Sequence, residues 1–237
     1  MNSNQTRSIM KTMKLSKLKI ALVLCASLFL SASVNAQEKE EKKVKDATTV
    51  LADFSKMKES IPSELLAVTQ GIIVVPKLIN AGFVIGAKRG KGVAMVKRAD
   101  GTWSNPVFVT ITGGSIGAQI GVQSVDLVLV FKHSNSLTDI KKSSFTLGGD
   151  LSVAAGPVGR NSTANTDYKL EAEVYSYSRS KGLFAGISLN GASLAIDAPS
   201  NTAFYGKAMT AHKIFDAADN SSAIVKELKS TLTSMQK

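Results

Sequence analysis

The chain has 237 residues, of which 44% are hydrophobic and 6% aromatic, and it carries 29 Lys and Arg against 18 Asp and Glu. One cysteine and two histidines argue against a disulfide framework and against a metal site built from clustered Cys and His. Basic residues do not alternate with aromatic platforms, so the composition does not indicate nucleic-acid binding.

Residues 1–36 have the three parts of a secretory signal peptide. Five basic residues and no acid precede an apolar run from Ile20 to Leu30, and a stretch of small and polar residues ends at Ala36. This order is typical of a cleaved signal, and the run is short for a bilayer span of roughly 20 residues. We therefore expect an exported chain that begins near Gln37 and is periplasmic, associated with the outer membrane, or secreted.

Two alternatives to cleavage are a retained membrane anchor and lipid attachment at Cys25. Bulky Leu24 precedes Cys25 where a lipoprotein signal has a small residue, which favours an ordinary cysteine within the apolar run. Cleavage would leave a chain without thiols, holding 24 basic and 18 acidic residues for a formal charge of +6. Such a balance favours contact with anionic surfaces.

After the signal peptide, the charged stretch 37–45 offers no apolar surface to bury and is expected to be a mobile linker. The folded domain should then span residues 46–237. Asp46 is expected to cap a helix whose apolar residues follow helical spacing, and a short second helix is expected over residues 64–70.

The middle of the chain is rich in glycine. Sixteen of the 18 glycines lie between Gly82 and Gly191, among alternating apolar residues that predict strands. Glycines inside strands indicate bulges, bends or close backbone packing. The expected strands cover residues 72–75 (ended by Pro76), 93–97 and 107–111 (joined by a turn at 99–101), 125–131, 170–177 and 183–196.

The C-terminus returns to helical spacing, with Ile224, Val225, Leu228 and Leu232 on one stripe. The expected fold class is therefore α+β: N-terminal helices, a glycine-rich curved antiparallel sheet or partial barrel, and a C-terminal helix.

One motif suggests catalysis. Residues 113–117 match the G-x-S-x-G pattern around Ser115, and Asp197 and His212 follow in the order of a serine hydrolase. The segment after Gly117 predicts a strand, whereas this motif needs a strand-to-helix turn, so a glycine-rich bend explains the match equally well. A serine hydrolase using Ser115 is kept as an alternative, and neither a catalytic residue nor a cofactor is expected.

A second motif is basic. Residues 86–92 resemble a phosphate loop, but three residues stand where four must precede Gly-Lys, and Gly92 replaces the required Ser or Thr. We expect instead a basic turn of Lys88, Arg89 and Lys91 that meets anionic groups. A merely solubilising loop is the alternative.

Several strings, in order, resemble the SYLF domain family between about residues 72 and 205. They are residues 81–86, 101–108, 113–123, 146–150, 154–160 and 175–186. The resemblance implies membrane-lipid binding without catalysis; eukaryotic members bind phosphoinositides and a yeast branch also binds actin. A stand-alone exported chain resembles the bacterial branch, and export argues against actin as a partner.

The expected function is non-enzymatic binding of anionic phospholipid headgroups at a membrane surface, with a structural envelope protein as a further alternative. For Arg160 and Arg179, whose guanidinium groups can grip a phosphate with two bonds, the alternative is a salt bridge to Asp167, Glu171 or Glu173. The candidate lipid-binding residues are Lys88, Arg89, Lys91, Arg160, Arg179 and Lys181.

Overall fold

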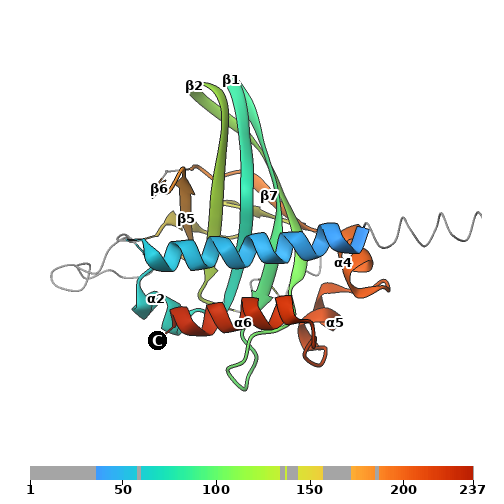
Figure 1. The fold of residues 1–237 in the computed structure, drawn as a ribbon. Helices are drawn as coiled ribbons and strands as arrows, with labels where there is room; N and C mark the ends of the chain where they lie inside the picture. Colours follow the sequence, from blue (N-terminus) through green and yellow to red (C-terminus); the bar gives the residue numbers. More distant parts are fainter. Residues whose placement is uncertain are drawn as a thin grey trace, which may run out of the picture.

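The computed structural model describes residues 36–57, 60–133, 137, 144–156, 172–184 and 187–236; for residues 83–85, 115–121 and 184 it describes the backbone alone. A helix over residues 36–56 comes first. The later elements are α2 (Ser63–Val68), β1 (Gly71–Val96), β2 (Val107–Phe131), β3 (Ser144–Leu147), β4 (Val153–Ala155), β5 (Val174–Ser180), β6 (Leu183–Phe184), β7 (Ala192–Ile196), α4 (Ala198–Tyr205), α5 (Ala211–Asp216) and α6 (Ala223–Met235). This arrangement confirms the expected α+β class (Figure 1).

The N-terminal helix begins well before the expected cap at Asp46. Residues 37–45, expected to be a mobile linker, are helical, and within them Glu40 and Val44 are buried. Their charges obscure an apolar stripe in the sequence. The stripe consists of Val44, Ala47, Leu51 and Phe54, all fully buried at the three- and four-residue spacing of one helix face.

Strands β1 and β2 form the centre of the sheet and pair with each other along almost their whole length, from Gly71 opposite Phe131 to Ala94 opposite Val107. The expected stop at Pro76 is wrong, because a bulge between Val75 and Leu78 carries the strand past the proline. The hairpin expected around residues 99–101 is confirmed.

Each of these two strands folds back near its middle. A Cβ placed on Gly92 would lie 2.0 Å from the carbonyl oxygen of Val74, so the two halves of β1 approach closely around a bend near residue 83. The halves of β2 likewise have different neighbours: residues 109–112 pair with β7 and residues 126–131 pair with β5. Glycine permits this backbone contact because it has no side chain to displace.

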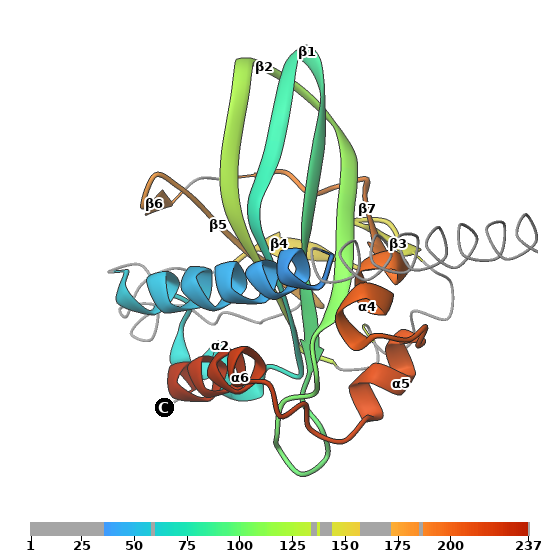
Figure 2. The same ribbon diagram turned by 45° about the vertical axis from the view of Figure 1, so that its right-hand side comes forward.

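The seven described strands make one mixed sheet that curls into a half-barrel. β3 adds to β7, β4 pairs in parallel with β5, and β6 pairs with the end of β5. One apolar core fills the inside of the curl, where α5 contributes Ile214 and Phe215. A second core lies between the other face and the helices, including Leu228 and Leu232 of α6, which confirms the predicted C-terminal stripe. The N-terminal helix crosses this second face (Figures 1 and 2).

Candidate functional site

The expected basic turn is not a turn. Residues 86–92 lie in β1 and pair with residues 109–115 of β2. Lys88 faces the inside of the curl, where it is buried and donates from Nζ to the carbonyl oxygen of Ser188. Burial lowers the pKa of its ammonium group. Lys88 therefore points into the interior of the fold and does not face the solvent.

Lys91 faces the opposite side of β1 and is also paired. Its Nζ lies 2.6 Å from the buried carboxylate of Asp197, which caps α4 by accepting from the backbone N–H of Ser200 at 3.2 Å. Burial alone would raise the pKa of Asp197, but the bonds from Lys91 and Ser200 outweigh it and lower that pKa. This pair fixes α4 against the sheet.

Arg179 forms a structural salt bridge, with partners other than those considered from the sequence. Its guanidinium donates to Asp126 of β2 at 2.9 and 3.1 Å and to Asp53 of the N-terminal helix at 2.7 Å. It also lies over the ring of Phe54, 5.6 Å from its centroid. Only 13% of the side chain is exposed. Arg160 lies outside the described residues.

The other two candidates, Arg89 and Lys181, are exposed, and neither has an ion-pair partner among the described residues. Arg89 lies on the face of β1 that carries Lys91. Lys181 and Gly182, with φ of 49° and 79°, form the tight turn between β5 and β6, just beyond Arg179. These positive φ values match the turns that favour two-residue hairpins.

A third exposed cation, Lys77, was not among the lipid-binding residues predicted from the sequence. It lies at the β1 bulge with φ of 52°, and its N–H donates to Asp126 at 3.0 Å. Its side chain is 69% exposed, and its Nζ lies 3.8 Å from a carboxylate oxygen of Asp46. Pro76 could have indicated the bulge at Lys77, because a proline within a strand is found at edges and bulges. Lys77 and Arg89 thus flank one part of β1, and Lys181 lies beside the same structure, since Ser180 Oγ donates to the carbonyl oxygen of Ser124 at 3.2 Å.

That structure is a projecting part of the folded-back hairpin, residues 79–87 of β1 and 113–124 of β2, which we call the arm. It rises beyond the helix layer in both views (Figures 1 and 2). Both cores end at its base, and none of its described side chains is buried. Its sequence has no charged residue. Two of its apolar side chains stand open to solvent: Ile79 is 42% exposed and Val122 is 75% exposed.

The hydrolase alternative has no support among the residues that the structure describes. Ser115 lies within strand β2 opposite Gly86, without the strand-to-helix turn that the nucleophile motif requires. Asp197 is paired with Lys91, and His212 lies 2.7 Å from Asp216 on the exposed face of α5.

Across the described residues, no group of three or more His, Cys, Asp or Glu could hold a metal ion. No helix in those ranges is long and apolar enough to cross a bilayer.

Comparison with known proteins identifies the family. The family model Ysc84, described as "Las17-binding protein actin regulator", matches residues 112–235, just over half of the chain. The chain belongs to the Ysc84 (SYLF) family. This confirms the family resemblance; the match covers most of β2, the later strands, and helices α4 to α6.

Several curated members of the Ysc84 family are similar over most of this chain. "SH3 domain-containing YSC84-like protein 1" of Xenopus laevis is 33% identical over 179 residues, 75% of this chain and 53% of that protein. The Homo sapiens protein of the same name is 34% identical over 177 residues, 72% and 52%. "LAS seventeen-binding protein 3" of Saccharomyces cerevisiae is 33% identical over 179 residues, 72% and 39%.

These names correct one expectation. Export was taken to argue against actin as a partner, but the matching Ysc84 family is described as an actin regulator and a yeast relative is named for binding Las17. The names describe binding and regulatory proteins. The chain spans about half the length, or less, of the curated relatives it matches.

Proposed function

We propose that this chain is a non-enzymatic binding module that attaches to anionic membrane surfaces through the base of its arm. The observation that carries the proposal is the position of Arg89, Lys181 and Lys77, three exposed cations bordering a projecting, charge-free structure. Export through the predicted signal peptide is part of the proposal, because it determines which membrane the module meets.

Electrostatics give the expected size of the effect. A Lys or Arg near an anionic bilayer contributes about 1 kcal/mol, and the attraction fades beyond a screening length of about 10 Å at 0.1 M salt. Arg89 and Lys181 have no acidic partner among the described residues, so no ion pair must break before they meet a phosphate. Lys88, Lys91 and Arg179 are excluded from this role because each is held by partners within the fold.

Vesicle flotation tests the proposal. The full chain should float with vesicles of phosphatidylglycerol and phosphatidylcholine more than with phosphatidylcholine alone, and binding should weaken at about 1 M salt, where the screening length is about 3 Å. Replacing Arg89 and Lys181 together by Ala should weaken binding roughly thirtyfold, the equivalent of about 2 kcal/mol.

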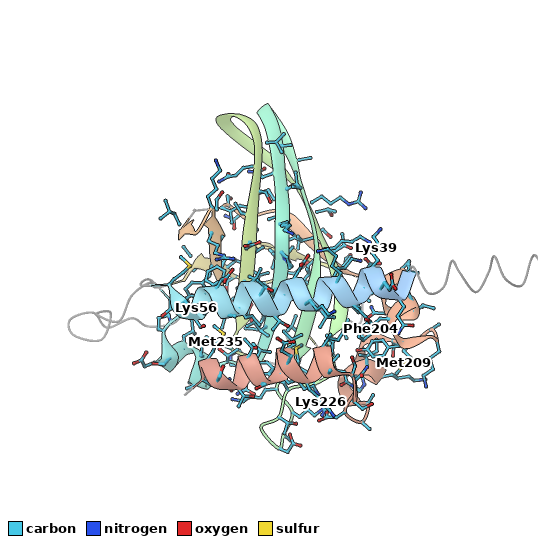
Figure 3. All side chains as sticks on the ribbon, viewed as in Figure 1. Lys39, Lys56, Phe204, Met209, Lys226 and Met235 are labelled. Atoms are coloured by element: carbon cyan, nitrogen blue, oxygen red, sulfur yellow. The ribbon has the colours of Figure 1, made fainter. Side chains whose placement is uncertain are left out.

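The matched control removes the same charge elsewhere. Lys213 of α5 and Lys226 of α6 are both exposed, and Lys226 lies at the end of the molecule away from the arm (Figure 3). Their double Ala variant should bind almost as well as the wild type. Equal losses in both double variants, or equal binding to neutral and anionic vesicles, would reject this site.

The relatives' names support a second candidate, binding to a protein of the actin-regulating machinery. Co-sedimentation with filamentous actin tests it directly. Actin binding by a chain that fails to float with vesicles would replace the membrane proposal with this one.

A further inference from the structure

The arm lacks the interactions that normally hold strands together in water. A two-stranded ribbon is at best marginally stable unless one face is buried, yet no described side chain of the arm is buried. A solvent-facing surface usually carries charged side chains at about a quarter of its positions, whereas the 21 residues of the arm carry none. Both features are those of a surface that is covered when the protein works.

The two exposed large apolar side chains lie on one face of the arm, Ile79 at its base and Val122 nearer its end. Ala81 pairs with Val122 and Ile79 pairs with Ser124, so Val122 and Ile79 are diagonal neighbours on the helix-covered face. Of the four large apolar side chains exposed in the described residues, the others are Val68 of α2 and Leu183 of β6. Val68 therefore offers a similar side chain at a distance from the arm.

We propose that the end of the arm inserts into the boundary between headgroups and acyl chains of a bilayer, while the cations at its base bind the phosphates. This inference rests on the proposed membrane function and adds the orientation of the chain relative to the bilayer. We choose a bilayer because cations border the arm on β1 and at the β5–β6 turn, whereas the arm beyond them has no charged residue and exposes Ile79 and Val122.

The dimensions agree with shallow insertion. Ala81, the partner of Val122, lies four residues beyond Lys77, about 13 Å at roughly 3.3 Å per residue. The polar layer on each side of a bilayer is about 5–8 Å thick. With Lys77 and Arg89 at the phosphates, this reach exceeds the polar layer, so Val122 would meet the acyl boundary even with the arm tilted. Deeper insertion is disfavoured because the outer edges of a ribbon carry backbone groups that need polar partners.

A fluorescent label at position 122 tests insertion separately from binding. The chain has one cysteine, so Cys25→Ser followed by Val122→Cys gives a single site for the environment-sensitive dye NBD. Val68→Cys in the same background is the matched control. On anionic vesicles, dye at 122 should shift to the blue and brighten severalfold, and lipids with a nitroxide on the acyl chain should quench it, whereas dye at 68 should keep its emission in water.

A second variant avoids the bulk of the dye. Val122→Asn keeps the charge and nearly the same size, and should weaken vesicle binding roughly tenfold because the apolar side chain no longer leaves water; Val68→Asn should not. If the chain floats with vesicles but dye at 122 does not respond and Val122→Asn binds normally, the insertion is refuted while the membrane function stands. Absence of flotation overturns both. A response at 122 to filamentous actin, and not to vesicles, would assign the arm to a protein partner instead.

Discussion

Arg179 of β5 donates to Asp53 of the N-terminal helix at 2.7 Å, which joins the first described helix to a strand 126 residues later in the chain. The same guanidinium holds Asp126 on the neighbouring strand. Since Phe54 beside Asp53 is fully buried in the core under the helix, this bond and that core hold the helix in one register on the sheet.

The first prediction concerns this salt bridge. Arg179→Met should lower the free energy of unfolding by about 2–3 kcal/mol, because two partly buried carboxylates lose their partner. Lys42→Met is the control: it removes an exposed pair with Asp46 and should cost less than about 0.5 kcal/mol. Urea unfolding followed by circular dichroism measures both. If the variant keeps its stability but binds vesicles more weakly, Arg179 binds lipid and is not a structural residue.

The second prediction concerns the close approach of the two halves of β1. Gly92→Ala would place a methyl group 2.0 Å from the carbonyl oxygen of Val74, a backbone atom that cannot rotate away. We expect a loss of about 3 kcal/mol or more. Gly114 has no neighbour within 4 Å of the same added atom, so Gly114→Ala should change stability by less than about 1 kcal/mol. Equal thermal unfolding of the two variants would contradict the folded-back strand.

The third prediction follows from the lowered pKa of buried Lys88. Between that lowered pKa and the ordinary 10.5, the unfolded chain holds a proton that the folded chain releases. The free energy of unfolding contributed by Lys88 therefore rises with pH across this window. Lys88→Met should lack the rise, while Lys213→Met, which changes an exposed lysine, should keep it.

Comparison of these variants with the wild type isolates Lys88 from other groups. Burial raises the pKa of both Tyr177 and Tyr205, which lowers stability as pH rises above their ordinary value of 10. That effect is common to all three proteins and cancels in the difference. Identical pH profiles for wild type and Lys88→Met would show that Lys88 is solvated in the folded chain.

The fourth prediction concerns processing. If residues 1–36 are a signal peptide, N-terminal sequencing of exported material should begin at Gln37 or within a residue or two. Cleavage there would keep Glu40, the first buried residue of the described helix over residues 36–56. An intact Met1 on exported protein would contradict the prediction.

Local patterns predicted the elements whose partners are close in the chain. The α6 stripe of Val225, Leu228 and Leu232 and the hairpin between β1 and β2 depend on spacing of 3.6 or two residues and on a nearby turn. The first part of the N-terminal helix was missed because the charges of residues 37–45 obscured an apolar stripe that only a packing partner makes visible.

The candidate site was harder to predict than the fold. The sequence predicted Arg89 and Lys181 as lipid-binding residues together with Lys88, Lys91 and Arg179. The fold leaves the first two exposed and turns the other three toward a carbonyl or a carboxylate. Neighbouring residues of a strand face opposite sides, so Lys88 and Arg89 have different environments although they are adjacent in the chain.

Ordered motifs and short-range periodicity were enough to predict the family, the α+β class and a glycine-rich curved sheet. Which cations stay exposed, and that a charge-free arm projects between them, depends on how distant segments pack together. Burial and ion pairing join residues such as Asp53 and Arg179 that are far apart in the chain, and no local pattern specifies which distant side chain will meet a given charge.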